Sequence, residues 1–183
     1  MVGVPDEADR GKRPVSAGLA GPYGHPFHPI LVTVPIGAWV ASLVFDLASR
    51  IVDQPGFLAQ GSEWLIAIGV LGALAAAMVG FLDLFGIPTG TPAFRTGLVH
   101  MALNLAVTVS FAVNFLWRRS DYGQPDPVDI GPIALSVVGI IALGVSGYLG
   151  GKLAFRYGVR VVYDADQAEG FGPTAGPARR VQP

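Results

Sequence analysis

Four long apolar stretches constrain this chain more than any other feature of its sequence. They cover residues 30–47, 64–85, 98–117 and 130–149, and each holds 18 to 22 residues. At about 1.5 Å of rise per residue, a helix of that length crosses the roughly 30 Å of hydrocarbon in a bilayer. The sequence therefore predicts an all-α, polytopic membrane protein, folded as a bundle of four transmembrane helices in contact with lipid.

Composition agrees with this prediction and excludes several classes of function. Hydrophobic residues make up 51% of the chain and charged residues 14%, whereas a soluble domain has about 25% charged residues. The net charge of −1 and the scattered basic residues give no surface for nucleic acid. The chain has no cysteine, which excludes disulfides, thiolate zinc sites and iron–sulfur ligation. A metal or cofactor would therefore be held by histidine, carboxylate or backbone.

The segments outside the spans lack a pattern that would build a core. Residues 1–24 mix charges with Gly and Pro and show no hydrophobic period, so they predict a flexible cytoplasmic arm. Residues 164–183 predict a disordered C-terminal tail for the same reason, and the transmembrane domain is assigned to 25–163. The sequence shows no strong internal repeat, although four spans in two hairpins are compatible with one.

Basic residues predict the orientation of the spans. Nine Lys and Arg residues lie on the side of the two termini, and three lie on the other side. The nine are Arg10, Lys12, Arg13, Arg95, Lys152, Arg156, Arg160, Arg179 and Arg180, and the three are Arg50, Arg118 and Arg119. Because Lys and Arg are enriched in cytoplasmic loops, both termini are predicted to be cytoplasmic.

Small residues recur at helical spacing on the second and fourth spans. The sets are Gly69, Gly72, Ala76 and Gly80, with Asp83 on the same face, and Ser136, Gly139, Gly147 and Gly150. Small residues at this spacing let helix backbones approach closely, which is a main source of packing energy between helices in lipid. The stripes predict a tightly packed bundle. A cofactor pressed against glycine backbone would need the same pattern.

Polar residues on the first and third spans are predicted to face the bundle interior. On the third span, the stripe consists of His100, Asn104, Phe111 and Asn114, which project within about 40° of one direction at 100° per residue. On the first span, one face carries His28, Pro35, Trp39, Ser42 and Asp46. Because ionisable and polar groups are costly in lipid, both stripes should point inward.

The predicted topology gathers the histidines at one end of the bundle. His28 opens the first span, Asp83 closes the second and His100 opens the third, all on the predicted cytoplasmic side. His25 and His28 each precede a proline, so this segment is extended, and polyproline geometry puts the two imidazoles about 9 Å apart on one side. Asp46 is expected near the opposite end, about 27 Å from His28.

Several motifs together resemble one protein family. They are HPFHPILVTVPIG at 25–37, Asp46 in the same helix, GFLDLFG at 80–86, LVHMALN at 98–104 and GYLGGKLAFRYGVRV at 147–161. Over roughly residues 21–163 the chain resembles the domain-of-unknown-function 2231 family, or DUF2231. The resemblance implies a bacterial four-helix protein of the inner membrane. Because some members are fused to Rieske-type iron–sulfur domains, it also implies a redox neighbourhood. The matching polar positions are His25, His28, Asp46, Asp83, His100 and Asn104.

Three functions fit these residues. The first is an accessory or structural subunit in a redox or respiratory context, in which His and Asp only hydrogen-bond between helices. Its partner would be a respiratory-chain protein or a second copy of the chain. Hydrolysis is not supported, because there is no GxSxG motif, and SGYLGGKL at 146–153 has Ser in place of the first Gly of a phosphate loop. Transport is the weakest alternative, because the spans hold few ionisable residues.

The other two functions involve a cofactor. One is electron transfer by haem b, with His28 and His100 as axial ligands. Its propionates would pair with Arg95, Lys152 or Arg156. The other is a metal site whose ligands are His25, His28, Asp83 and His100, with Asn104 as outer support. The sequence leaves these two alternatives open beside the accessory role.

Overall fold

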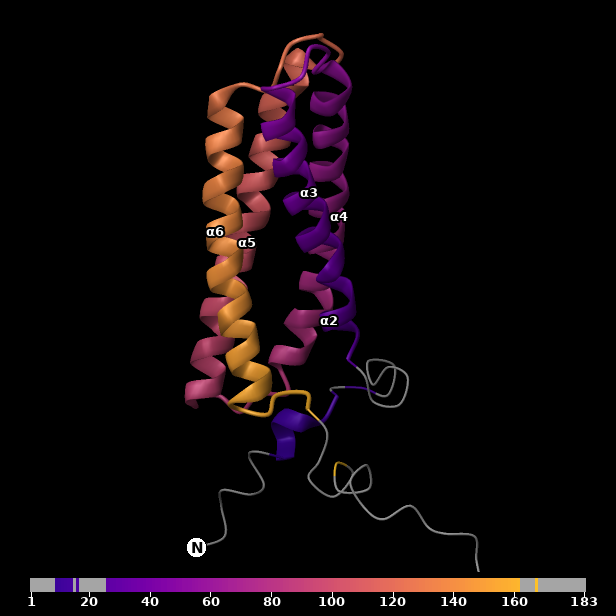
Figure 1. Cartoon of the computed structure of the whole chain (residues 1–183). Coiled ribbons are helices and arrows are strands. Elements are labelled where there is room, and N and C mark those ends of the chain that lie inside the picture. The colour runs from indigo at the N-terminus through magenta and orange to yellow at the C-terminus, as the bar shows by residue number, and fades with distance from the viewer. Residues whose placement is uncertain (1–8, 15, 17–25, 162–166, 168–183) are drawn as a thin grey trace, which may run out of the picture.

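The computed structural model describes residues 9–14, 16, 26–161 and 167 (Figure 1). Within these residues it contains no strand, and four long helices form an antiparallel bundle. The predicted all-α four-helix architecture is therefore confirmed. Most of the predicted arm and nearly all of the predicted tail lie outside the described residues, and so does His25.

Within residues 26–161, six helical elements follow one another. They are α2 (Phe27–Leu31), α3 (Thr33–Ser49), α4 (Gly56–Leu84), α5 (Pro92–Arg118), the 3-10 turn η3 (Arg119–Asp121) and α6 (Ile130–Phe155). Four helical segments are long and apolar enough to cross a membrane: Phe27–Ser49, Gly56–Leu84, Pro92–Asp121 and Ile130–Phe155. All four are longer than the apolar stretches, because polar residues such as Glu63 continue the helices beyond the hydrophobic windows.

Local sequence explains where the third long helix begins. The side chain of Thr91 accepts a hydrogen bond from the backbone N–H of Phe94 at 3.1 Å. Pro92 occupies the first helical position, where its missing N–H and fixed φ cost nothing. Such a cap satisfies one of the backbone donors that a helix leaves unpaired at its start. This start sets the register in which His100 and Arg118 face inward.

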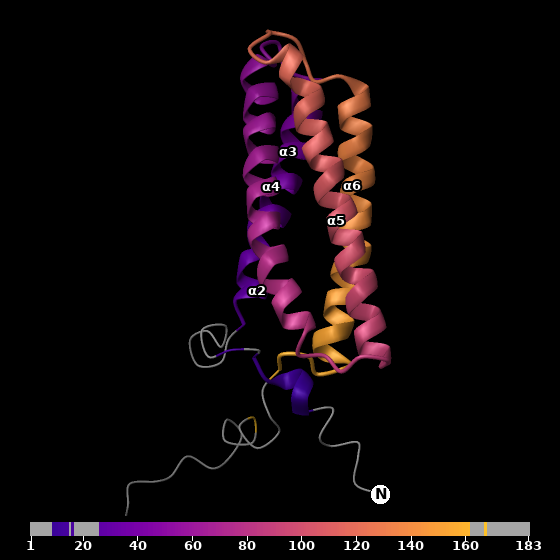
Figure 2. The same cartoon turned by 180° about the vertical axis from the view of Figure 1, so that it is seen from behind.

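The helices form two hairpins that lie side by side. Figures 1 and 2 show α3 with α4 in one hairpin and α5 with α6 in the other. Helices α3 and α5 run in the same direction, from the end that holds His28 and His100 to the end that holds Arg118. We call these the His end, at the bottom of Figure 1, and the Arg end, at the top.

The bundle has a small core and an apolar outer surface. The core cluster consists of Trp39, Ile66, Ala73, Val107 and Phe111. Side chains that face outward along the spans are also apolar; they include Val40, Val44, Leu71, Leu105, Val138 and Ile141, each at least 45% exposed. A helix that is apolar on all sides needs a lipid or protein environment around it. The outer faces therefore suit contact with a bilayer.

Candidate functional site

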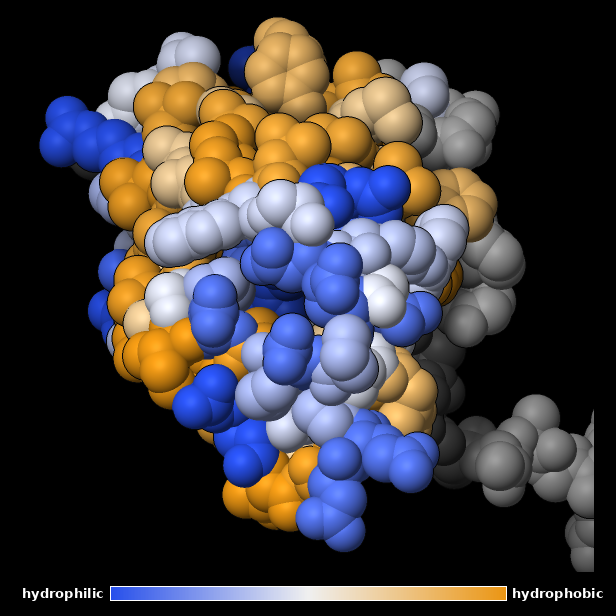
Figure 3. All heavy atoms as spheres, turned by 90° about the horizontal axis from the view of Figure 1, so that it is seen from above, coloured by the Kyte–Doolittle hydropathy of each residue, from blue (hydrophilic) through white to orange (hydrophobic). Residues whose placement is uncertain are grey.

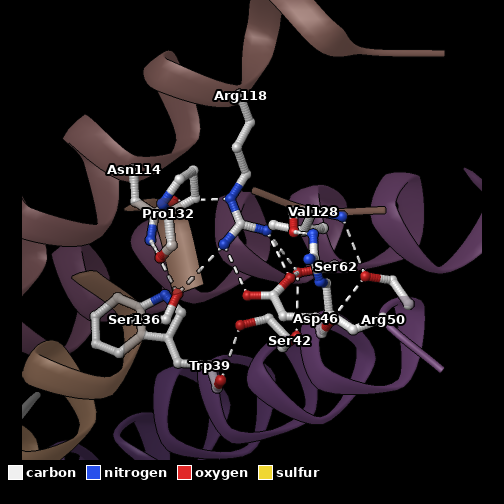
Figure 4. A network of polar contacts seen from close by, with 11 residues as sticks. Trp39, Ser42, Asp46, Arg50, Ser62, Asn114, Arg118, Val128, Pro132 and Ser136 are labelled. Carbon is white, nitrogen blue, oxygen red and sulfur yellow. Dashed lines mark hydrogen bonds and ion pairs between the residues drawn. The ribbon is translucent and has the colours of Figure 1, made fainter. Parts of the chain in front are cut away.

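A buried ion pair joins the two hairpins at the Arg end. The guanidinium of Arg118 donates to both carboxylate oxygens of Asp46, with Nη1 2.6 Å from Oδ1 and Nη2 2.7 Å from Oδ2 (Figure 4). Asp46 is 0% and Arg118 6% exposed. Two parallel, charge-assisted bonds are the strongest arrangement open to this pair. The contact therefore fixes the end of α5 against α3.

Neighbouring polar groups complete the coordination of the guanidinium. Nε of Arg118 donates to Oδ1 of Asn114 at 2.7 Å, and the remaining N–H groups reach the hydroxyls of Ser62 at 3.0 Å and Ser136 at 3.3 Å. All five donors of the guanidinium are thus used. Ser62 in turn donates to Asp46. Each of the four long helices supplies at least one member of this network.

The loop before α6 is fastened to the same end. The hydroxyl of Ser49 accepts a hydrogen bond from the backbone N–H of Val128 at 3.1 Å, and Arg50 donates to the carbonyl of Val128 at 3.3 Å. Figure 3 shows the polar face that results, with a hollow among hydrophilic side chains. Arg118, Glu63 and residues between Asp121 and Asp129 line a pocket at this end. Because Arg118 has used its donors, it has none left for a ligand there.

A stacked aromatic pair separates the two ends. The rings of Trp39 and Phe111 lie 4.2 Å apart with an angle of 6° between their planes. The indole N–H of Trp39 donates to the carbonyl of Ile66 at 3.3 Å. Gly69 and Gly139 make room for the pair, because a Cβ atom added there would come within 2.3 Å of the indole and 2.7 Å of the phenyl ring. The stack closes the middle of the bundle.

The imidazoles of His28 and His100 meet at the His end. Their ring centroids are 6.3 Å apart, and the ring planes are nearly perpendicular at 83°. His28 comes from α2 and His100 from α5, so the two rings belong to different hairpins. The convergence of these two histidines, which the topology predicted, is confirmed. Both rings are partly buried.

Both imidazoles are oriented by backbone carbonyls. Nδ1 of His28 lies 2.8 Å from the carbonyl oxygen of Ala76, and Nδ1 of His100 lies 2.9 Å from that of Ser146. Because a carbonyl only accepts, each Nδ1 carries a proton, and in the neutral ring Nε2 then keeps its lone pair. Histidines that bind metals are held in the same way, with the other ring nitrogen donating to a carbonyl or carboxylate. Both rings therefore have the tautomer of a ligand.

Glycines form the walls on which the rings rest. A Cβ atom added to Gly80 would lie 2.8 Å from the His28 ring, and one added to Gly150 would lie 3.1 Å from the His100 ring. The small-residue stripes of the second and fourth spans thus serve to seat side chains of the first and third. Gly147, which was predicted on the same packing face, has no other atom within 4 Å of an added Cβ, so that assignment was wrong.

A family model described as "Predicted membrane protein (DUF2231)" matches residues 24–163. The chain belongs to the DUF2231 family. The matched region contains the His28–His100 pair, the aromatic stack and the Asp46–Arg118 network, and it confirms the resemblance seen in the motifs. No curated protein and no solved structure matches this chain.

The two hairpins of this DUF2231 bundle are related by a pseudo-two-fold axis along the bundle. Residues 28, 39 and 46 of the first hairpin recur 72 positions later as 100, 111 and 118. Residues 61, 69 and 80 recur 70 positions later as 131, 139 and 150, and in both hairpins these six are glycines. The same contacts recur in both hairpins: a histidine ring packs on one glycine, and an aromatic ring packs on another. Three contacts on this axis join a residue to its own counterpart: His28 to His100, Trp39 to Phe111 and Asp46 to Arg118.

The remaining predicted residues of the DUF2231 site lie around the histidine pair. Oδ1 of Asp83 is 3.1 Å from Nε of Arg160, which follows α6, and Asp83 lies within electrostatic range of His28. Nδ2 of Asn104 donates to Nε2 of His100 at 3.1 Å. Arg95, Lys152 and Arg156 lie at the His ends of α5 and α6. Among the described residues, no group of three or more His, Asp or Glu side chains is arranged to hold a metal ion.

Arg118 is the central residue that sequence reasoning missed. It was counted among the charges outside the membrane, because it follows the third apolar stretch directly. Its spacing was a usable signal: it lies four residues after Asn114 and seven after Phe111, on the inward stripe of the third span. Only its pairing with Asp46, 72 residues away, required the tertiary structure.

Proposed function

We propose that this protein binds haem b between His28 and His100 and serves electron transfer in the membrane. The observation that carries the proposal is the imidazole pair itself: two histidines from different hairpins, with ring centroids 6.3 Å apart and each Nδ1 held by a backbone carbonyl. Nε2 of His100 is bonded to the amide of Asn104, which would have to release it. Two imidazoles from different helices are the axial ligand set of b-type haem sites in bundles.

The separation of the rings supports opposed ligands. With metal–nitrogen bonds of about 2.0–2.1 Å, two imidazoles on opposite sides of one ion have ring centroids about 6.4 Å apart, whereas a tetrahedral angle gives about 5.2 Å. The centroid separation of 6.3 Å is compatible with two imidazoles that would hold one iron between them. The angle of 83° between the ring planes is compatible with this, because two ligands on opposite sides of one metal can have any angle between their planes.

The donor set favours haem over a bare ion. The described residues hold no third ligand arranged with the two histidines, and Asp83 is paired with Arg160. Haem needs only two protein ligands, because its macrocycle supplies four nitrogens. The metal site formed by His25, His28, Asp83 and His100 stays a prediction, since His25 lies outside the described residues.

Haem would supply one-electron exchange at the His end, and the chain would supply its position and charge environment. Arg95, Lys152 and Arg156 are the basic residues proposed to pair with the propionates. Asn104 would release Nε2 of His100, and its amide has an alternative acceptor in the carbonyl of His100, 3.0 Å away. A redox or respiratory-chain protein is the proposed partner for the electron.

An accessory role is the second candidate, and one observation favours it. The bond from Asn104 satisfies Nε2 of His100 without any ligand. The His100 ring can therefore act as a structural hydrogen-bonding link between helices. In that case the protein would act through a partner in the membrane. Copurification of a stoichiometric partner with a colourless protein would select this role over haem binding.

The absorption spectrum of the purified protein tests the proposal. The chain is expressed with iron and haem precursor, purified in detergent and measured in the oxidised and dithionite-reduced states, with elemental analysis of the same sample. We expect a Soret band, and a reduced-state α band, at about one haem per chain. A folded protein without colour and without metal would contradict both cofactor hypotheses.

Histidine variants assign the ligands. His100→Ala should abolish stoichiometric haem binding, because His100 is the ligand with the fuller hydrogen-bond support. His28→Ala should lose the spectrum of a haem with two histidine ligands. His25→Ala is the matched control and should keep that spectrum. Loss of bound metal in His25→Ala would instead favour the four-ligand metal site.

We also propose that both termini are cytoplasmic in a bacterial plasma membrane, as the distribution of Lys and Arg indicates. The chain has no cysteine, so single cysteines report topology without background. A membrane-impermeant maleimide should label Asp126→Cys in intact spheroplasts. Ser16→Cys should react only after permeabilisation, and the reverse pattern would contradict the orientation.

A further inference from the structure

Three basic side chains lie where α5 and α6 meet at the His end. Arg95 belongs to the start of α5, Lys152 lies in the last turn of α6, and Arg156 follows α6 directly. Arg95 and Arg156 are exposed, and Lys152 is half-buried. Figure 2 shows α5 and α6 side by side down to this end. The three residues therefore belong to one end of a single hairpin.

The packing of α5 on α6 places these residues at one level. Three rings of α5 pack on glycines of α6 in antiparallel register; the pairs are His100 with Gly150, Phe111 with Gly139 and Trp117 with Gly131. When this register is continued toward the end of the hairpin, Arg95 comes level with residues 153–155. Arg95 therefore lies opposite the stretch between Lys152 and Arg156.

Helical period places the three side chains on one outer flank. The ring of Trp117 packs on Gly131 and is 55% exposed, so this contact marks the outward-facing line along which α5 and α6 touch. We call this line the α5–α6 seam. At about 100° per residue, Arg95 lies within about 40° of Trp117 around α5. Around α6, Lys152 and Arg156 lie within about 60° and about 20° of Gly131. All three belong to the α5–α6 seam.

The charges on this seam differ from those of the other arginines in their neighbours. Within the described residues, none of the three side chains forms a salt bridge with a carboxylate. At the Arg end, by contrast, Arg118 is paired with Asp46 and Arg119 with Glu63. The α5–α6 seam thus carries positive charge that no described carboxylate neutralises by direct contact.

Helix dipoles account for only part of this charge. Lys152 and Arg156 lie at the C-terminus of α6, where a cation is favourable. Arg95 lies near the N-terminus of α5, where the dipole already presents positive charge and an anion is favourable. A bound anion at this place would therefore complement both Arg95 and the start of α5.

We propose that the α5–α6 seam binds an anionic phospholipid, whose phosphate lies among Arg95, Lys152 and Arg156. Basic residues at the end of a spanning helix lie at the depth of the headgroups. Deeper in the span, the same flank presents exposed apolar side chains, Val99 at 57% and Val145 at 52%. A free phosphate would use only the basic residues, whereas a lipid also covers this apolar flank with its acyl chains.

The inference does not depend on haem binding. Haem propionates would use the same three side chains, and a propionate and a phosphate would compete there. Lipid binding is therefore measured on protein that is expressed without added haem precursor.

Native mass spectrometry of the detergent-purified protein tests the inference. The protein is titrated with phosphatidylglycerol and, separately, with phosphatidylcholine of the same acyl chains. We expect phosphatidylglycerol to bind at least about tenfold more tightly, because each Lys or Arg near an anionic lipid surface contributes about fivefold. Equal affinities would overturn the inference. Glycerol phosphate, which has no acyl chain, should bind far more weakly; binding as tight as that of the lipid would overturn the choice of a lipid.

Paired variants with the same change in net charge locate the site. Arg95→Gln with Arg156→Gln should weaken phosphatidylglycerol at least about tenfold and leave phosphatidylcholine unchanged. The matched control is Gln54→Glu with Gln124→Glu, which also lowers the net charge by two but changes exposed residues at the Arg end. The control should keep the preference of the wild type. Equal losses in the two doubles would show that only net charge matters.

Salt dependence provides a readout that needs no variant. Raising NaCl from about 0.05 M to about 0.5 M should weaken the binding of phosphatidylglycerol to the wild type, because the exposed charges are screened. Phosphatidylcholine has no net charge, so its binding should change little. A preference for phosphatidylglycerol that does not respond to salt would contradict recognition by these basic side chains.

Discussion

Arg118→Met is expected to destabilise the folded bundle by about 3–5 kcal/mol, because removal of one partner of a buried ion pair leaves the other charge uncompensated. The charge left behind is Asp46, which is 0% exposed. Asn114 and the two serines that contact the guanidinium also lose a partner. Unfolding by a denaturing detergent, followed by circular dichroism in mild micelles, would measure the loss.

Arg95→Met is the matched control for this change. It removes the same side chain from an exposed position at the opposite end of the bundle. Surface substitutions of this kind usually change stability by less than about 0.5 kcal/mol. Similar losses in the two variants would mean that the Asp46–Arg118 pair contributes nothing specific.

A double variant distinguishes the effect of the ion pair from the effect of one unpaired buried charge. Asp46→Leu combined with Arg118→Met removes both charges, so no buried charge remains unpaired. Ser62 then retains the carbonyl of Ser42 as an acceptor at 3.1 Å, and Asn114 retains that of Pro132 at 2.9 Å. We expect the double variant to be more stable than Arg118→Met alone. A double variant that is less stable would show that the two residues act independently.

Gly69→Ala is expected to cost about 1–3 kcal/mol, because one added methyl group overpacks the centre of the bundle. The added Cβ would lie 2.3 Å from Nε1 and 2.5 Å from Cδ1 of Trp39. The indole ring is stacked on Phe111 and cannot move without breaking the stack. A lower thermal midpoint and a shifted Trp fluorescence maximum would report the change.

The same substitution at Gly144 provides the control. An added Cβ there meets no other atom within 4 Å, and alanine is the better helix former by up to about 1 kcal/mol. We expect Gly144→Ala to be neutral or slightly stabilising. If both alanine variants lost the same stability, the cause would be a general property of the helices rather than the seat of Trp39.

Much of the fold followed from hydropathy. The four apolar stretches predicted four spanning helices, because a segment in lipid must satisfy its backbone internally. The helices are longer than predicted. Polar residues near the bilayer surface continue a helix, but they end the apolar stretch from which its length was predicted. The inward stripes were also predicted well: Trp39, Ser42, Asp46, Phe111 and Asn114 are all buried.

The internal two-fold relation was not visible in the sequence. Few side chains are identical between the hairpins, and the partners at corresponding positions differ in kind, as Asp46 and Arg118 do. What repeats is the set of contacts, including three glycines against three rings in each half. A repeat of contacts becomes visible only when the partners of each residue are known.

The sequence by itself determined that this chain forms four apolar helices, which residues line their inner faces and that His28 and His100 share one end. Those properties depend on hydropathy and helical period, which are local. The tertiary structure alone decided that Arg118 is buried against Asp46, that Trp39 stacks on Phe111 and that the two imidazoles lie 6.3 Å apart. These pairings depend on the register between the two hairpins. That register is set by packing between side chains 72 positions apart in the sequence.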